Sequence, residues 1–485
     1  MTTMPDSRSP ANPTAGIELL RRLDDSHITR AHWKILFISG MGFFTDAYDL
    51  FIIGVVMSML KPEWHPSPVA AGLVTSTALI AAAIGALAFG RIADILGRKR
   101  IYGYEVLVLA IGAIASAFSP SIWWLIGFRF VLGVGIGGDY PVSSTIMSEY
   151  ASKATRGMMV TLVFTMQAAG LIVGPLLAAA LLSTHLSHDM VWRILLAFGA
   201  IPALSVFQMR RHLAETPRFL LARGAHEEFR SAADAVLAER QQRAAARPFE
   251  TERPAGQAGR DPGFGEGFRI LLTRNDLLLR LIGVSAAWFL MDLAYYGNTV
   301  STPLVLGAIA PGDSLLRRTL IQLVIFALAA LPGYFVAALT IDRLGRKPIQ
   351  VIGFLMMAMS FGLMALIPGI ERLIVPFLII YGISYFFTEF GPNATTFVYP
   401  AEVFPVEVRT TGHGVASAAG KIGAFVGVFL FPIMMARRGL GGAEAMASLA
   451  CILGLAVTLF MLPETKGRSL EELSALAITE GVAVR

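Results

Sequence analysis

The sequence predicts an all-α polytopic membrane protein, with twelve transmembrane helices in two pseudo-symmetric six-helix halves. Three observations support this class: the composition, the spacing of the apolar segments and an internal repeat. Of the 485 residues, 55% are hydrophobic and only 15% are charged, whereas soluble domains carry roughly 25% charged residues. The mean hydropathy is +0.63, and the apolar residues extend along most of the chain, so a soluble protein is excluded.

Twelve apolar segments reach or approach the roughly 20 residues that a bilayer core requires. The first six lie at 33–60, 69–93, 101–119, 121–147, 157–182 and 191–209. The second six lie at 279–302, 319–341, 349–368, 373–399, 411–436 and 443–462. We therefore expect an N-terminal segment (1–32), a first half (33–209), a linker (210–278), a second half (279–462) and a tail (463–485).

Three loop motifs of the first half recur in the second half, in the same order. GRIADILGRKR (90–100) recurs as LTIDRLGRKP (339–348), SEYASKATRG (148–157) as AEVFPVEVRTTG (401–412), and AETPRFL (214–220) as PETKGRS (463–469). The repeat aligns Asp94 with Asp342, Glu149 with Glu402, and Arg156 with Arg409. Two related halves around a central cavity are typical of secondary transporters, whose sites lie near the middle of the membrane.

The run from Arg129 to Tyr150 is expected to be the most closely packed span. Its glycines lie at 133, 135, 137 and 138, and small residues let helices approach closely in a membrane. Asp139 and Tyr140 follow them directly. Because an acid inside an apolar span is costly, it usually faces a partner or a water-filled path. The alternative is an aspartate at a helix end, in the headgroup region.

The basic loops predict the orientation of the chain. DILGRKR (94–100), SKATRG (152–157) and DRLGRKP (342–348) are rich in Lys and Arg, and such loops face the cytoplasm. We therefore expect a multi-pass protein of the plasma (inner) membrane with both termini in the cytoplasm. The net charge of +6 is explained by these loops, so no nucleic-acid partner is expected.

The loop motifs and the terminal PETKGRS resemble those of the major facilitator superfamily, over nearly the whole chain. GFFTDAYDLFIIGVV (42–56) and GGDYPVSSTIMSEYA (137–151) are more specific and resemble its phosphate:proton symporter family. The resemblance implies a phosphate site at Tyr140, Gln167, Trp288, Asp292, Tyr296, Asn393 and Lys421. It also implies a proton path at Asp46, Asp49 and Asp139. PETKGRS is similar to sugar porters as well, and the run DAYD (46–49) is distantly similar to aromatic-acid symporters.

The residues alone also predict an anion site. Trp288, Asp292 and Tyr296 are four residues apart and share one helix face. Gln167 and Lys421 occupy equivalent places in the two halves, and so do Asp139 and Asn393. The two members of each pair are therefore expected to face each other across the cavity. Lys421 is the only Lys or Arg in the middle of a predicted span, and a buried ammonium needs an acid or an anionic ligand. A structural Lys421–Asp292 pair without substrate is the alternative.

Hydrogen-bond donors dominate the expected site, which suits an oxyanion with many acceptor lone pairs. Asp292 fits phosphate in particular, because near neutral pH phosphate keeps a P–OH group whose hydrogen bond a carboxylate can accept, whereas sulfate has no such group. We also expect Asp292 to be a proton-coupling residue, whose proton occupancy changes as the anion enters and leaves. Helix packing is the alternative role for Trp288 and Tyr296. We expect no cofactor and no metal, because the chain has no Walker loop, hydrolase motif or zinc-like Cys/His spacing.

Two further groups of charges are expected to serve the transport cycle. Asp46 and Asp49 share a face of the first helix, and neighbouring buried carboxyls suit a proton carrier; solvated acids at a helix break are the alternative. A charge latch between the halves is expected from Asp94, Arg98, Glu149, Arg156, Asp342, Arg346, Glu402 and Arg409. The alternative for these loop charges is a purely topological role. Glu389 is a further acid within a span, which is expected to pair inside its own half.

The sequence thus predicts a proton-coupled importer of inorganic phosphate that works by alternating access and is not an enzyme. Phosphate, protons and the lipid bilayer are the expected partners. A proton symporter for an organic acid or a sugar is the nearest alternative. A phosphate receptor that does not transport is an alternative from another class, favoured only by the long linker. The oligomeric state stays open, and a monomer is compatible with the sequence.

Overall fold

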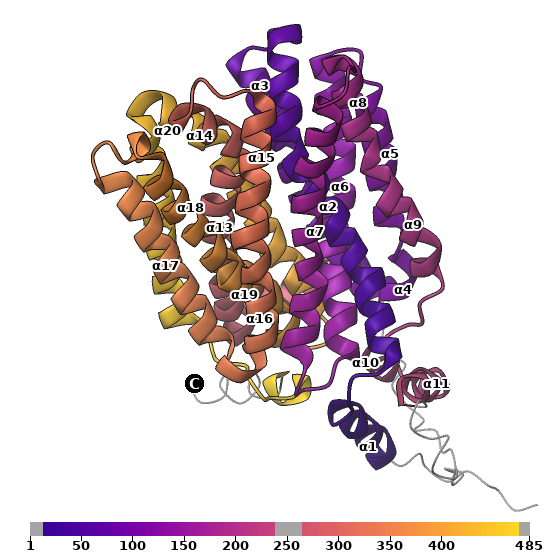
Figure 1. Ribbon diagram of the computed structural model, residues 1–485. Helices are drawn as coiled ribbons and strands as arrows, with labels where there is room; N and C mark the ends of the chain where they lie inside the picture. Colours follow the sequence, from indigo (N-terminus) through magenta and orange to yellow (C-terminus); the bar gives the residue numbers. More distant parts are fainter. Residues whose placement is uncertain (1–12, 238–263, 475–485) are drawn as a thin grey trace, which may run out of the picture.

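The computed structural model describes residues 13–237 and 264–474, and every regular element within these ranges is helical. Eleven helical segments among the described residues are long and apolar enough to cross a membrane, and four of them combine consecutive helices. They form one bundle, in which the first half and the second half lie side by side (Figure 1). The predicted all-α membrane class is confirmed.

The first half follows the predicted spans closely. Two short breaks within it each divide one predicted span into two helices. Its helices are α2 (Arg30–Trp64), α3 (Pro68–Leu96), α4 (Arg98–Ile101), α5 (Tyr104–Ala117), α6 (Ile122–Tyr150), α7 (Arg156–Leu182), α8 (His188–Phe198) and α9 (Ala200–Arg211). The break between α8 and α9 lies at Gly199.

The second half contains more interruptions than its sequence indicates. Its helices are α13 (Asn275–Val300), α14 (Thr302–Ile309), α15 (Leu315–Ile325), the π-helix η2 (Phe326–Ala330), α16 (Leu331–Leu344), α17 (Arg346–Leu366), the 3₁₀-helix η3 (Ile370–Arg372), α18 (Ile374–Phe390), α19 (Pro392–Val403) and α20 (Arg409–Met461). The helical geometry of α20 breaks at Gly439, where φ is 70° and ψ is −178°, a conformation open essentially to glycine alone. This break lies between the predicted spans 411–436 and 443–462, so the eleven helical segments account for twelve crossings.

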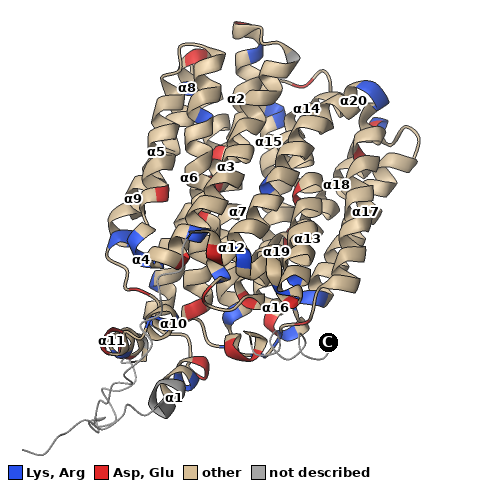
Figure 2. Ribbon diagram, turned by 180° about the vertical axis from the view of Figure 1, so that it is seen from behind, with Lys and Arg blue, Asp and Glu red and all other residues tan. Residues whose placement is uncertain are grey.

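Four short helices lie at or beside one end of the bundle, which we call the latch end (Figure 1; α12 is labelled in Figure 2). They are α1 (Pro13–Asp24), α10 (Pro217–Ala222), α11 (His226–Leu237) and α12 (Phe264–Thr273). Figure 2 shows that many of the charged residues gather at this end. Part of the predicted linker, 238–263, lies outside the described residues, and α13 begins at Asn275, before the predicted start at 279.

The glycines of α6 allow its backbone to touch α3, as their spacing predicts. A Cβ atom added to Gly133 would lie 2.2 Å from the carbonyl oxygen of Ala78, and one added to Gly137 would lie 1.8 Å from that of Ala82. Neither position has room for a side chain. This contact fixes the height and rotation of α6, and with them the position of Tyr140 one turn further along.

Candidate functional site

Lys421 lies in α20 and is almost fully buried, with 1% of its surface exposed. Its Nζ donates to Asp292 Oδ2 at 3.1 Å and to the hydroxyl of Tyr296 at 2.8 Å. The ammonium also lies 4.4 Å from the ring centroid of Tyr140 and 4.3 Å from that of Tyr296. A cation over a desolvated aromatic face gains about 2 kcal/mol. One carboxylate and two aromatic rings therefore stabilise this charge.

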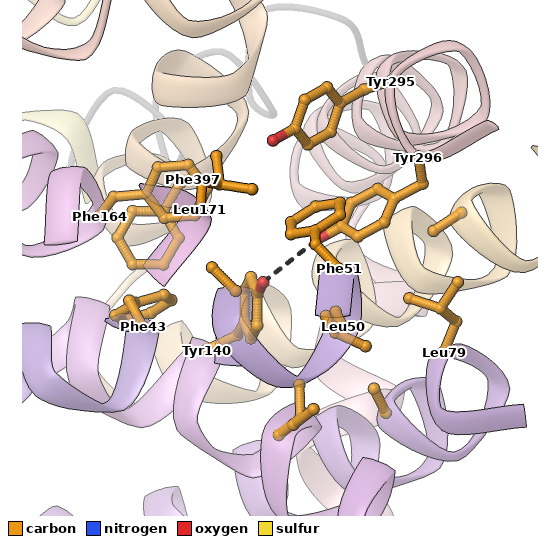
Figure 3. Packing of buried hydrophobic residues seen from close by; sticks show 14 of the residues in the cluster. Phe43, Leu50, Phe51, Leu79, Tyr140, Phe164, Leu171, Tyr295, Tyr296 and Phe397 are labelled. Atoms are coloured by element: carbon orange, nitrogen blue, oxygen red, sulfur yellow. Dashed lines mark hydrogen bonds between the residues drawn. The ribbon is translucent and has the colours of Figure 1, made fainter. Parts of the chain in front are cut away.

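A polar chain leads from Tyr296 across the boundary between the halves. The Tyr296 hydroxyl lies 3.5 Å from that of Tyr140 in the first half (Figure 3). Gln167 Nε2 then donates to the Tyr140 hydroxyl at 3.0 Å. The chain returns to the second half through Tyr334, whose hydroxyl donates to Gln167 Oε1 at 3.1 Å.

The chain ends at Asn393 and Glu389, on either side of the junction between α18 and α19 at Gly391. Asn393 Nδ2 donates to the Tyr334 hydroxyl at 3.0 Å and also to Glu389 Oε2. Both side chains are buried. We call the eight connected residues the site chain: Asp292, Lys421, Tyr296, Tyr140, Gln167, Tyr334, Asn393 and Glu389.

Aromatic side chains pack beside the site chain. The ring of Trp288 lies with its centroid 6.1 Å from that of Tyr140. Phe43 packs edge-on against Tyr140 at 5.1 Å, and Phe164 stacks on Phe397 at 4.6 Å (Figure 3). These buried rings surround the polar groups with apolar surface, and electrostatic interactions are stronger in such a low-dielectric environment.

All seven residues predicted for the substrate site are buried in this region, and six belong to the site chain, with Trp288 beside it. Gln167 and Lys421 do not touch; Tyr140 and Tyr296 lie between them. The role of Tyr334 was not predicted, although a tyrosine inside a predicted span was a visible signal. The connection of Glu389 to Asn393 agrees with the expected pairing of Glu389 inside its own half.

Asp46 and Asp49 are both fully buried in α2, and none of their carboxylate oxygens has a hydrogen-bond partner among the described residues. Asp49 lies against the α8–α9 break, where a Cβ on Gly199 would be 2.2 Å from Asp49 Oδ1. Arg129 donates to the backbone carbonyl of Asp49 at 3.0 Å. Buried acids without donors inside a membrane bundle are candidates for carrying protons.

The prediction that Asp139 faces Asn393 is wrong. Arg210, at the end of α9, donates to the two carboxylate oxygens of Asp139 at 2.7 and 3.0 Å, and to Glu105 at 2.9 Å. A buried carboxylate binds a guanidinium within reach because the pair neutralises both charges. The repeat could not predict this pair, because Arg210 lies at the start of the predicted linker. Arg129, inside α6, is a further buried cation that was not predicted.

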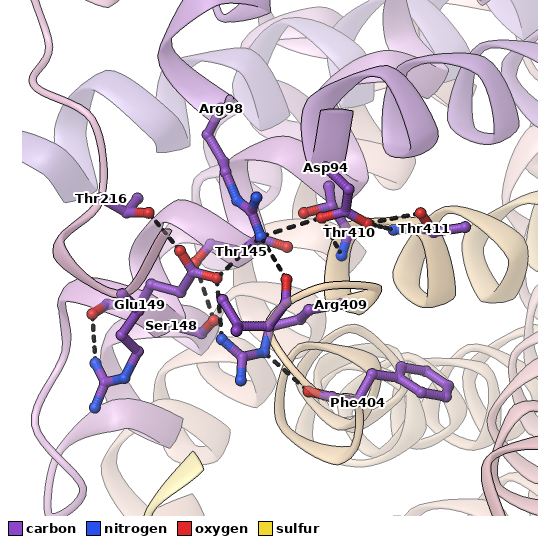
Figure 4. A network of polar contacts seen from close by, with 12 residues as sticks. Asp94, Arg98, Thr145, Ser148, Glu149, Thr216, Phe404, Arg409, Thr410 and Thr411 are labelled. Atoms are coloured by element: carbon purple, nitrogen blue, oxygen red, sulfur yellow. Dashed lines mark hydrogen bonds and ion pairs between the residues drawn. The ribbon is translucent and has the colours of Figure 1, made fainter. Parts of the chain in front are cut away.

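At the latch end, Glu149 connects arginines of both halves (Figure 4). Arg98 and Arg409 lie 3.2 and 3.0 Å from Glu149 Oε1. Arg98 also pairs with Asp94 at 3.1 Å. Asp94 in turn accepts hydrogen bonds from the backbone N–H and the hydroxyl of Thr411, at 2.7 and 2.6 Å. The start of α20 is thereby held against the first half.

A second cluster repeats this arrangement with the halves exchanged. Arg346 pairs with Glu402 at 2.7 Å and with Asp342 at 2.9 Å. Asp342 accepts hydrogen bonds from the backbone N–H groups of Gly157 and Met158, at 3.1 and 2.7 Å. These groups lie at the start of α7, where free N–H groups and the helix dipole favour a negative charge.

Arg156 departs from this symmetry and extends the network to α1 and to the segment that follows α20. It lies 3.4 Å from Asp24 and donates to the carbonyl oxygen of Arg468 at 3.1 Å. Arg218 also pairs with Asp24, at 2.6 Å, and with Glu471 at 2.9 Å. Burial raises the pKa of Glu471, but the charge of Arg218 outweighs this and holds the pKa below its ordinary value. The eight predicted latch residues thus lie together at one end of the bundle.

Known proteins resemble this chain in both sequence and structure. Residues 34–477 match the family described as "Sugar (and other) transporter". The inorganic phosphate transporter 1-6 of Oryza sativa subsp. japonica is 37% identical over 469 residues, which cover 86% of this chain and 85% of that protein. The low affinity inorganic phosphate transporter 1 of Petunia hybrida is 36% identical over 465 residues, with the same coverage of both proteins.

The structure of the proton:xylose symporter XylE bound to 6-bromo-6-deoxy-D-glucose is similar to this fold, with a TM-score of 0.76. The match covers 92% of this chain and 98% of that one, at 21% identity. This likeness concerns the fold alone, and it confirms the predicted arrangement of two six-helix halves.

Proposed function

This chain belongs to the sugar (and other) transporter family and has the major facilitator fold, and from that premise we propose that it imports inorganic phosphate together with protons by alternating access. The relatives at 36–37% identity are named inorganic phosphate transporters, and they support phosphate as the substrate. The chain is a transporter and not an enzyme.

The observation that carries the proposal is Lys421 at the junction of the halves, buried beside hydroxyl and amide groups. A phosphate oxygen is a strong acceptor, so it replaces part of the contact between Lys421 and Asp292, which lie 3.1 Å apart. Tyr140, Gln167 and Asn393 supply further donors from both halves. Binding therefore connects the two halves through the anion.

Asp292 gives the proposed site its preference for phosphate. Its carboxylate accepts a hydrogen bond from a P–OH group, while Lys421 balances the remaining negative charge of the anion. A fully ionised oxyanion such as sulfate offers no proton and is repelled. Trp288, beside the site chain, closes the site against water and is the seventh contact residue.

Asp46 and Asp49 are the proposed proton carriers in the first half. Both are buried without hydrogen-bond donors among the described residues, so each has room to take up a proton. Asp139 belongs to the same path. It keeps its charge in a pair with Arg210 at 2.7 Å, and this charge interacts electrostatically with a proton bound to Asp46 or Asp49. Asp292 changes its proton occupancy as the anion enters and leaves.

The two latch clusters are the proposed cytoplasmic gate. In this structure Arg409 and the backbone N–H and hydroxyl of Thr411 reach acids of the first half, while Asp342 reaches the start of α7. These contacts hold the latch end closed, and their rupture opens it, which gives the fold its two discrete states. Both chain ends then lie in the cytoplasm, as the basic loops predict, and the protein resides in the plasma membrane.

Purified protein in proteoliposomes tests this function. Labelled phosphate should accumulate under an inward proton gradient and leave again when a protonophore collapses the gradient. Asn in place of Asp46 or Asp49 should abolish accumulation but leave phosphate binding measurable. Loss of binding in both variants, with the fold intact, would instead place these acids in the substrate site.

A competition panel separates the alternatives. Arsenate should inhibit phosphate uptake, whereas sulfate, benzoate and glucose should not. Inhibition by benzoate or glucose together with their own uptake would indicate an organic-acid or sugar symporter. Saturable phosphate binding without any accumulation would indicate a receptor.

A further inference from the structure

Glu389 is a buried acid for which the proposed cycle has no role. It lies in α18 with none of its surface exposed, and Asn393 of α19 donates to its Oε2. The titratable groups that face it are Tyr334 of α16 and Tyr295 and Asp292 of α13. Its described surroundings therefore offer hydroxyls, an amide and a second acid, but no cation.

Two polar atoms in this place make no hydrogen bond to any other described residue: Glu389 Oε1 and the hydroxyl of Tyr295, which face each other. These two atoms can satisfy each other in either protonation state, because Tyr295 can donate to a carboxylate or accept from the O–H of a carboxylic acid, so the charge of the site decides between the two states. A carboxylate would be a buried charge without a cation, which is strongly disfavoured. The geometry is therefore that of a site occupied by a proton.

We propose that Glu389 is an additional proton carrier, coupled to the opening of the latch end through Tyr334. This inference rests on the proposed function and adds a coupling site to it. In the closed state the Tyr334 hydroxyl donates to Gln167 Oε1 across the boundary between the halves, at 3.1 Å, and Glu389 holds its proton.

The opening of the latch end separates Gln167 from Tyr334. The Tyr334 hydroxyl then donates to Glu389 and stabilises its carboxylate, and the Glu389 proton passes to water on the open side. After closure Gln167 accepts from Tyr334 again, and Glu389 takes up a proton before the next opening. One proton per cycle is carried in this way, with no bond broken other than the O–H bond of the acid.

Glu444 provides a matched control in the same half. It is also fully buried, and its Oε2 accepts from Asn298 at 3.4 Å. It makes no hydrogen bond to the site chain in the described part of the protein. Glu444→Gln therefore removes an equally buried acid without touching the connection between the halves.

The experiment measures the steady-state phosphate ratio in proteoliposomes at a gradient of one pH unit, with the membrane potential clamped at zero. Each coupled proton multiplies this ratio by about ten per pH unit, since a tenfold change in proton activity is worth 1.36 kcal/mol. Glu389→Gln should lower the ratio about tenfold relative to the wild type. Phosphate–phosphate exchange, which moves no net proton, should continue near the wild-type rate.

Glu444→Gln and Glu389→Asp should both keep the wild-type ratio, the second because it retains a carboxyl. An unchanged ratio in Glu389→Gln would overturn the proposal. Loss of exchange in that variant would overturn it as well, because Glu389 would then be needed for binding or folding. Failure of the proposed function is a different result: the wild-type protein itself would not accumulate phosphate.

Discussion

Polar side chains join the halves at two levels, the latch and the site chain, and the two levels use the internal repeat in opposite ways. In the latch each half contributes an equivalent pair, Arg98 with Glu149 and Arg346 with Glu402. In the site chain the first half contributes only the neutral Tyr140 and Gln167, and every charged group comes from the second half. A single anion needs a single cation, and a duplicated lysine would leave one ammonium buried without a partner.

The latch itself is not fully symmetric, and mutations in its two clusters can test this asymmetry. Glu149 holds two arginines, Arg98 and Arg409, whereas Glu402 holds Arg346 alone among the described ion pairs. The counterpart of Arg409 in the repeat, Arg156, pairs with Asp24 instead. The first cluster therefore depends more heavily on one carboxylate.

Replacing either Glu149 or Glu402 with glutamine should have the largest effect on the stability of the protein, and the two variants should lose unequal amounts of stability. Glu149→Gln leaves Arg409 without a carboxylate, and breaking a buried ion pair in this way costs about 3–5 kcal/mol. Glu402→Gln leaves Arg346 paired with Asp342 at 2.9 Å, so the loss should be nearer the 1–3 kcal/mol of an unmade buried hydrogen bond.

Thermal unfolding of the purified variants in detergent measures this difference. The melting temperature should fall clearly further for Glu149→Gln than for Glu402→Gln. Lys153→Ala, which removes a half-exposed pair with Asp25, serves as the control and should change little. Equal losses for the two glutamates would contradict the asymmetry of the latch.

At the site chain, Asp292→Asn should change selectivity more than stability. The substitution removes the acceptor for the P–OH proton and the charge that repels sulfate. Because a hydrogen bond to a charged group is worth about 1.5–3 kcal/mol, discrimination between phosphate and sulfate should fall about tenfold or more. Accumulation should also lose its pH dependence.

Binding and competition assays across about pH 5–8, where phosphate and a buried carboxyl both titrate, measure this change. Asp292→Glu keeps the acid and should retain most of the discrimination. If Asp292→Asn excludes sulfate as well as the wild type does and responds to pH in the same way, Asp292 has only a structural role.

The sequence was sufficient to predict most of the fold. The twelve spans follow from runs of apolar residues, and the close approach of α6 to α3 follows from the glycines at 133 and 137. The interruptions of the helices were less predictable. The π-helix η2, for example, consists of residues that also form ordinary α-helices. The break of α20 at Gly439 depends on a single backbone conformation that glycine permits but does not require.

The position of a site residue was predictable where it follows from the face of its own helix, as for Asp292 and Tyr296. Contacts were less predictable where the partner side chain lies on another helix. Asp139 lies at the expected height in α6, yet its partner Arg210 comes from the end of α9, and no spacing in the sequence relates the two. Tyr334 was missed for the same reason, since its contacts with Gln167 and Asn393 depend on how α16 packs against α7 and α19.

Phosphate binding by purified protein, with and without Lys421, tests the central claim most directly. The wild type should bind phosphate saturably in a calorimetric titration. Lys421→Ala and Lys421→Gln should bind none, because an uncharged group does not offset the desolvation of the anion; Lys153→Ala should bind like the wild type. Near-normal phosphate binding by folded Lys421→Ala protein would contradict the site described here.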